Sequence, residues 1–187
     1  YHYKKSVLDD DLSLRILDKY LEILDPTKSY LLASDIEEFA QHEIRFDDYL
    51  RYSDLKAAFD IFVRYRQRVS ERIAKAVELL DHDFDFTRDE TFTFDREEAP
   101  WAETEVALQE LWRKRVKNDV LALELAGDKR DEAKKKLTQR YLGIARRKEQ
   151  LDSEDIFQTF INAYTTSIDP HTAYFSPRTS ENFKIRM

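Results

Sequence analysis

Turn-forming residues are scarce in this sequence. Its 187 residues include two glycines and four prolines, whereas 37% of them are charged. A β-sandwich or β-barrel needs many tight turns, and glycine and proline supply most of those turns. The scarcity therefore argues against a many-stranded β fold, and we predict an all-α fold of six to seven helices in an irregular bundle.

Three further absences limit the class of protein. There is no cysteine, which excludes cysteine catalysis and fits either a reducing compartment or an oxidising one whose proteins avoid stray thiols. No stretch approaches the roughly 18 apolar residues that span a bilayer, and no signal peptide is present. The net charge of -7 argues against general affinity for nucleic acid, because phosphates attract basic surfaces.

Catalytic and metal-binding motifs are missing as well. Gly127 and Gly143 lie in or beside expected helices, with no G-x-S-x-G or phosphate-binding loop around them. The four histidines show no H-E-x-x-H spacing. Acidic residues of 81–85 mimic the start of a calcium loop, but Phe86 and Phe92 stand where that loop needs glycine and glutamate. We therefore predict no catalytic residue, no cofactor and no metal ligand.

Apolar residues at helical spacing predict the positions of the helices. The expected helices cover 12–24, 34–40, 53–80, 100–127 and 128–150, and a last one runs from 152 to the Asp169-Pro170 pair. Their expected starts are a capping box of Ser34 with Glu37, an N-cap at Ser53, Pro100 in a first turn, and Asp152 or Ser153. Trp101 and Trp112 are three helical turns apart, so both are expected in the core.

The segment between 81 and 100 interrupts the helical pattern. Phenylalanines alternate with polar residues near 84–94, which is typical of a short hairpin or an extended loop held by aromatic side chains. Such a segment is either a lid or a packed connector, and a packed connector is the simpler interpretation.

Positive charge is concentrated in one part of this acidic chain. Residues 112–148 hold 13 Lys and Arg against 5 Asp and Glu. Lys134, Lys135 and Lys136 are the densest point of this region and are a candidate contact with a partner. A solvated helical hairpin explains the same charges equally well.

The C-terminal end carries the most specific pattern. An aspartate before proline ends a helix, and its carboxylate can accept a hydrogen bond from a backbone N–H two residues on. Asp169-Pro170 has this form, and residues 183–187 then alternate as in a strand with one buried face. Because the chain starts at Tyr1 and its only methionine is Met187, we expect a segment of a longer protein, with the strand truncated.

Several motifs resemble one protease family. Residues 167–175 resemble the L-D-P-H-[ST]-x-Y-[LF] signature that precedes the PDZ domain of carboxy-terminal processing proteases, which are serine peptidases. Other matches point to the N-terminal helical region of the tail-specific protease branch. They are Tyr3-Lys4-Lys5, Leu24-Asp25-Pro26 with Tyr30, Arg96-Glu97-Glu98-Ala99-Pro100-Trp101, residues 111–117, Asn162-Ala163-Tyr164, and Phe175-Ser176-Pro177-Arg178 with Glu181-Asn182-Phe183.

The resemblance implies a periplasmic parent enzyme whose signal peptide is not in this sequence. It also implies a PDZ domain that engages apolar substrate C-termini, a Ser/Lys dyad downstream of Met187, and in some members a lipoprotein adaptor. No residue here inherits a catalytic role. Residues 1–175 would form the N-terminal helical domain, and 176–187 would be a linker and first strand leading into the PDZ domain. The expected junction residues are Asp169, Pro170, His171, Tyr174 and Phe175.

Two other classes of function remain open at this stage. One is a free-standing helical adaptor that binds partner proteins, which the truncated strand makes less favourable. The other is a small helical enzyme that uses carboxylates such as Asp81, Asp83 or Glu97 in a polar pocket between helices. His171 has two interpretations as well, a ligand-binding residue or a residue with a local packing role in its turn.

Overall fold

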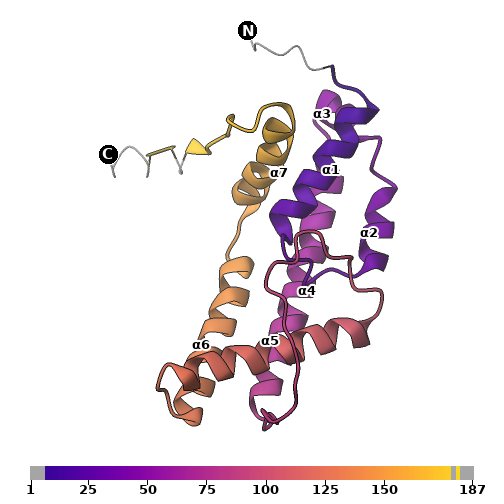
Figure 1. The fold of residues 1–187 in the computed structure, drawn as a ribbon. Coiled ribbons are helices and arrows are strands. Elements are labelled where there is room, and N and C mark those ends of the chain that lie inside the picture. The colour runs from indigo at the N-terminus through magenta and orange to yellow at the C-terminus, as the bar shows by residue number, and fades with distance from the viewer. Residues whose placement is uncertain (1–6, 178–179, 182–187) are drawn as a thin grey trace. The chain divides into compact units, whose positions relative to one another are not determined.

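A computed structural model describes residues 7–177, 180 and 181 (Figure 1). Within these residues the chain forms seven α-helices, which confirms the predicted all-α fold of six to seven helices. They are α1 (Asp10–Leu24), α2 (Ala33–Ala40), α3 (Phe46–Tyr52), α4 (Lys56–Leu80), α5 (Glu105–Leu125), α6 (Arg130–Glu149) and α7 (Ser153–Ile168). The strand predicted at 183–187 lies outside the described residues.

The chain divides into two compact units. The first consists of the described residues up to Leu24, Glu37–Val63, and the described residues from Leu151 onward. The second consists of Asp25–Ile36 and Arg64–Gln150. Helix α4 therefore contributes its first turns to the first unit and the remainder to the second.

The first unit is built around α1, which packs against α3 and α7 (Figure 1). Asp9 caps α1 by accepting the backbone N–H of Leu12 at 2.9 Å. The Tyr20 ring packs edge-on against Phe160 of α7 with centroids 5.5 Å apart, and the Tyr20 hydroxyl donates to the Ala58 carbonyl at 3.0 Å. The ring contact holds α7 against α1, and the hydroxyl keeps a hydrogen-bond partner although it is buried.

The second unit has an aromatic core around Trp112 of α5. The Trp112 indole N–H donates to the carbonyl of Ser29 at 2.6 Å, and its ring lies 5.5 Å from Tyr30 and 6.1 Å from Tyr141 of α6. Asp25 is buried and accepts the backbone N–H groups of three residues, Ser29, Tyr30 and Leu31. Trp112 is a core residue, as predicted from the sequence.

Two predicted helix starts are wrong by a few residues. Helix α2 begins at Ala33, so Ser34 lies inside it, and Asp35 instead accepts the backbone N–H of Leu32 at 3.0 Å. Ser53 follows α3 in the left-handed conformation (φ 56°) and ends that helix, while Asp54 accepts the N–H of Lys56 at the start of α4. The short helix α3 was not among the predicted helices.

The predicted helix start at Pro100 is also wrong. Helix α5 begins at Glu105, where Thr104 accepts the N–H of Ala107 at 3.1 Å. The preceding residues are held extended because Ala102 forms a parallel bridge with Leu32, and its carbonyl accepts the N–H of Ala33 at 2.9 Å. Trp101 therefore lies outside α5, half-buried, with Lys28 Nζ 5.7 Å from the centre of its ring.

The segment between α4 and α5 is an extended loop, since its residues form no hairpin in the described structure. Phe84 contacts Phe86 and Phe92 contacts Phe94, with ring centroids 6.3 and 5.0 Å apart. The loop is also held to α5 by ion pairs of Glu90 with Arg113 and Lys117.

Candidate functional site

The residues that follow Asp169 pack on helix α7, which is capped at its start and bonded to α1 at its end. Asp152 caps it in a capping box with Asp155, in which Asp152 accepts two backbone N–H groups and Asp155 accepts the N–H of Asp152. Its far end is tied to α1, where the Ser167 hydroxyl donates to the Arg15 carbonyl at 3.2 Å. The start of α7 is therefore capped locally, and its end is tied to α1.

A tight turn at Asp169 ends α7. The Asp169 carboxylate accepts the backbone N–H of His171 at 3.0 Å and the hydroxyl of Thr172 at 3.0 Å. The hydrogen bond to the N–H two residues on confirms the predicted role of this aspartate. Pro170 follows in the turn and cannot donate to the helix, so the chain leaves α7 at this point.

The chain then folds back along α7, and two amide side chains hold it there. Asn162 accepts the backbone N–H of Tyr174 at 2.7 Å and donates to the Tyr174 carbonyl at 3.1 Å. One turn earlier on the helix, Gln158 accepts the N–H of Ser176 at 2.8 Å. Because Tyr174 pairs with Asn162 and Ser176 with Gln158, residues 169–176, here called the junction segment, run antiparallel to α7.

The side chains of the junction segment differ in how deeply they are buried. Tyr174 is half-buried and packs edge-on against Phe157 of α7 with centroids 5.6 Å apart. Ser176 is completely buried. Phe175 is 54% exposed, and His171 and Pro170 are exposed as well. Of the five predicted junction residues, Asp169 therefore forms the turn and Tyr174 packs against α7.

Sequence reasoning missed the helix residues that hold this segment. Asn162 entered the sequence argument only as part of a matching motif, and Gln158 and Phe157 were not considered as site residues. Their signal is the spacing of two carboxamides four residues apart, which places them on one face of α7. Carboxamides both donate and accept, so they suit the main chain of an adjacent segment.

The lysine cluster lies on α6 in the second unit. Lys134 Nζ is 3.6 Å from a carboxylate oxygen of Asp83, and Lys136 Nζ is 2.6 Å from that of Asp128. Lys135 is exposed. Two of the three cations are thus already neutralised by carboxylates of the same unit, and Lys135 is the one that points outward with its charge unshared in the described residues.

The acidic candidates for a catalytic role lie on the surface. Asp81, Asp83 and Glu97 are exposed. Asp85 forms a local turn in which its carboxylate accepts the N–H and hydroxyl of Thr87, and these hydrogen bonds lower the Asp85 pKa. Among the residues that the structure describes, no three His, Asp or Glu side chains are grouped so that they could hold a metal ion. No helix in that part of the chain is long and apolar enough to cross a membrane.

Comparisons with known proteins agree with the sequence motifs. Residues 1–178 match the family described as the tail specific protease N-terminal domain. The chain is 43% identical over 183 residues to a protein of Haemophilus influenzae named tail-specific protease. The matched region is 97% of this chain and 26% of the relative, so the chain spans about a quarter of that protein's length. The resemblance drawn from the sequence is confirmed.

Proposed function

Because this chain belongs to the family of tail-specific protease N-terminal domains, we propose that it positions the domains that follow it in a periplasmic serine endopeptidase. The parent enzyme would degrade proteins through their apolar C-termini, with a PDZ domain next along the chain and a Ser/Lys dyad in a later protease domain. The chain itself is the non-catalytic part. Family membership favours this function over that of a free-standing adaptor.

The observation that carries the proposal is the main-chain pairing of the junction segment with α7. A flexible linker would leave its backbone groups to water, but here both polar groups of Tyr174 and the N–H of Ser176 bond to helix side chains. The helix is in turn fixed to α1 through Phe160 and Ser167. The direction in which the chain leaves residue 176 is therefore set by the first unit, which is what a positioning domain requires.

Two partners besides the downstream domains fit the proposal. Protein substrates with apolar C-termini would be delivered by the PDZ domain, whose orientation depends on the junction segment. A lipoprotein adaptor would contact the basic surface of α6, where Lys135 is an exposed cation. The chain alone is expected to hydrolyse nothing, and incubation with an unfolded protein bearing an apolar C-terminus tests this directly. Cleavage that survives removal of contaminating proteases would overturn the non-catalytic assignment.

The positioning role is tested in the full-length enzyme with the Asn162→Ala variant. We expect slower turnover of an unfolded protein with an apolar C-terminus, while a small fluorophosphonate label still reacts normally with the catalytic serine. Thr159→Ala is the matched control, because Thr159 is on α7 and its hydroxyl bonds only to the Asp155 carbonyl of the same helix. Normal turnover in Asn162→Ala would reduce the junction segment to a passive linker.

A further inference from the structure

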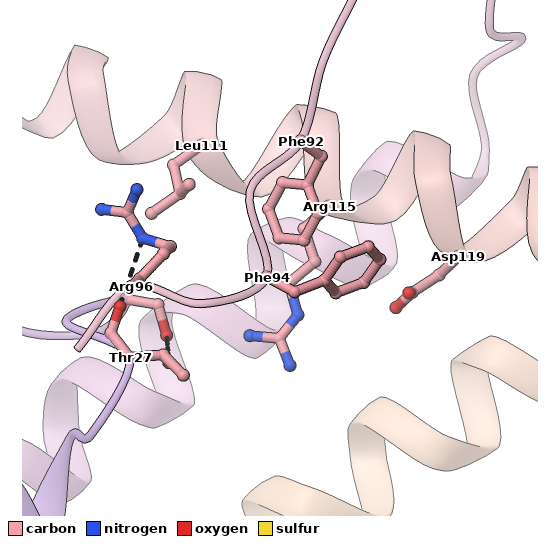
Figure 2. A pocket seen from close by; sticks show the side chains of 8 residues that line it. Thr27, Phe92, Phe94, Arg96, Leu111, Arg115 and Asp119 are labelled. Atoms are coloured by element: carbon pink, nitrogen blue, oxygen red, sulfur yellow. Dashed lines mark hydrogen bonds between the residues drawn. The ribbon is translucent and has the colours of Figure 1, made fainter. Parts of the chain in front are cut away.

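The second unit contains a cavity of about 200 Å³ under the loop that precedes α5 (Figure 2). Phe92 and Phe94 of the loop and Leu111 of α5 form its apolar wall. Arg96 and Asp119 also line it, and Figure 2 shows them on opposite sides of the two phenylalanine rings. The cavity thus combines an apolar surface with the cation Arg96 at one end and the carboxylate of Asp119 at the other, and a second arginine, Arg115, lines it as well.

The loop that forms this cavity is held on both sides of the phenylalanine pair. Before it, Glu90 pairs with Arg113 and Lys117 of α5. After it, the Arg96 Nε–H donates to the carbonyl of Thr27 at 3.2 Å (Figure 2). The cavity therefore exists before any ligand arrives, which lowers the entropy cost of binding.

The apolar wall is partly open to solvent. Phe94 is 67% exposed, although it packs edge-on against Phe92 with centroids 5.0 Å apart. An exposed aromatic side chain at the edge of a preformed cavity offers apolar area that a ligand would remove from water.

The charged groups that line the cavity differ in how many contacts they already make within the protein. Asp119 accepts the hydroxyl of Tyr141 at 2.7 Å. Arg115 also lines the cavity, but it is engaged by the core. Its guanidinium lies 4.6 Å from the centre of the Trp112 ring, and its charge opposes the rise that burial causes in the Tyr30 pKa. Arg96 uses only its Nε atom, and in the part of the chain that the structure describes neither of its Nη atoms has a hydrogen-bond partner.

These observations limit the ligand. The Nη pair of an arginine matches a carboxylate with two parallel hydrogen bonds. A cavity of about 200 Å³ is below the roughly 300–1,000 Å³ of sites for whole small molecules, and it has room for one large side chain. We propose that it binds a peptide through one apolar side chain and an adjacent carboxylate, with the side chain against Phe92, Phe94 and Leu111 and the carboxylate on Arg96.

Three small probes test the proposal and identify the source of the carboxylate. N-acetyl-phenylalanine has a terminal carboxylate, N-acetyl-phenylalaninamide has none, and N-acetyl-aspartyl-phenylalaninamide carries one on a side chain. The NMR signal of the Trp112 indole N–H is the reporter, because it donates to Ser29 at the cavity wall. We expect saturable shifts with the first probe and about tenfold weaker binding of the neutral amide, a loss of roughly 1.4 kcal/mol.

The third probe shows whether the carboxylate comes from a chain terminus or from an acidic side chain. Binding as tight as that of the acid shows that an acidic side chain suffices, and binding as weak as that of the amide shows that a chain terminus is required. Equal affinity for the acid and the neutral amide, or no shift with either, would overturn the proposal.

Two variants link the binding to this cavity. Phe94→Ser removes an exposed ring and leaves the Arg96 anchor in place, so the chain should fold normally and bind N-acetyl-phenylalanine about tenfold more weakly. Arg96→Met should abolish the difference between acid and amide. Arg88→Met is the control, because Arg88 is an exposed cation of the same loop that does not line the cavity. Unchanged binding in both test variants would place the probe elsewhere and contradict the assignment.

Discussion

Asn162 and Tyr174 form a two-point contact between a helix side chain and the main chain that leaves the helix. The Asn162 carboxamide accepts the Tyr174 N–H at 2.7 Å and donates to the Tyr174 carbonyl at 3.1 Å. A neighbouring strand would satisfy the same two backbone groups, so the carboxamide takes the place of a strand at this position. The chain is thereby held in an extended conformation without a sheet.

The Asn162→Ala variant should release this contact without unfolding α7. Loss of two hydrogen bonds at a half-buried site should cost about 1–2 kcal/mol locally. Hydrogen exchange of the Tyr174 amide measures this, and its protection should fall about tenfold or more. Asn162→Asp is the matched variant, since a carboxylate still accepts the Tyr174 N–H but cannot donate to its carbonyl. We expect the Tyr174 amide to stay protected in that variant, and equal exchange in all three proteins would contradict the contact.

The Tyr174→Ala variant separates the ring from the main chain. The ring is half-buried and packs edge-on against Phe157. Its removal should therefore cost about 1–2 kcal/mol, less than the roughly 3 kcal/mol of a fully buried aromatic side chain. Urea unfolding of the chain measures the loss. Phe175→Ala, which removes a 54% exposed ring from the next residue, should change stability by less than about 0.5 kcal/mol. An equal loss in the two variants would show that the Phe157 contact is not the cause.

The sequence predicted the structural features that depend on contacts between residues close together in the chain. The stripe on α1, the cap at Asp152 and the turn at Asp169 all follow from spacing or from bonds that span a few residues. The start of α5 could not be predicted from such local patterns. Its first expected turn is held extended by the pairing of Ala102 with Leu32, a contact between residues 70 positions apart that overrides the preference of Pro100 for a helix start.

In the candidate site, too, the short-range contacts could be predicted from the sequence and the longer-range contacts could not. Asp169 was identified because its hydrogen bonds reach two and three residues along the chain. The partners of Tyr174 and Ser176 lie 12 and 18 residues earlier, and which helix face the returning chain meets depends on the direction of the turn. That direction is a property of the folded chain and has no signature in spacing alone.

The basic surface of α6 gives a charge-dependent prediction. Reversing Lys134 or Lys136 would also place a carboxylate beside Asp83 or Asp128, so Lys135→Glu is the cleaner variant. If this surface contacts the adaptor, Lys135→Glu should weaken binding by the full-length enzyme roughly threefold to tenfold at low salt, and less at high salt. Arg140→Glu, another exposed cation of α6, is the control. Equal binding by both variants and the unaltered protein would identify the lysine cluster as a solvated face.

Arg72 is an unusual core residue of the second unit. It is 1% exposed, and its Nη2 pairs with Glu105, but Nε and Nη1 are buried with no hydrogen-bond acceptor among the described residues. Because unpaired buried donors are unfavourable, Arg72→Met should leave stability within about 1 kcal/mol or raise it. Arg72→Ala should lose about 2–4 kcal/mol through the cavity that it creates.

Urea unfolding measures the free energy of unfolding of these two variants, and an unchanged m-value shows that only stability has changed. Glu105 is not stranded in either of them, since it is 40% exposed and also lies 3.4 Å from Arg68 and 3.7 Å from Lys75. Equal losses in Arg72→Met and Arg72→Ala would show that the charge of Arg72, and not its volume, supports the core.

Glu90 gives a prediction for pH. Hydrogen bonds from Arg113 and then Lys117 lower the Glu90 pKa from 4.5 to about 2. A carboxylate with a depressed pKa in the folded chain contributes stability that is complete above its unfolded pKa and is lost as the pH falls through the folded value. The stability advantage over Glu90→Gln should therefore be constant above about pH 5 and should disappear between pH 4.5 and about 2.

Unfolding of the two proteins across this pH range measures the effect, and salt should reduce it because the group lies near the surface. Glu97→Gln is the control, since Glu97 is an exposed residue of the same loop and its removal should give no such pH-dependent difference. The loop is the wall of the Phe92–Phe94 cavity, so Glu90→Gln should also increase hydrogen exchange of the loop amides at neutral pH. Unchanged exchange there would mean that the Arg96 anchor and the phenylalanine contacts hold the loop by themselves.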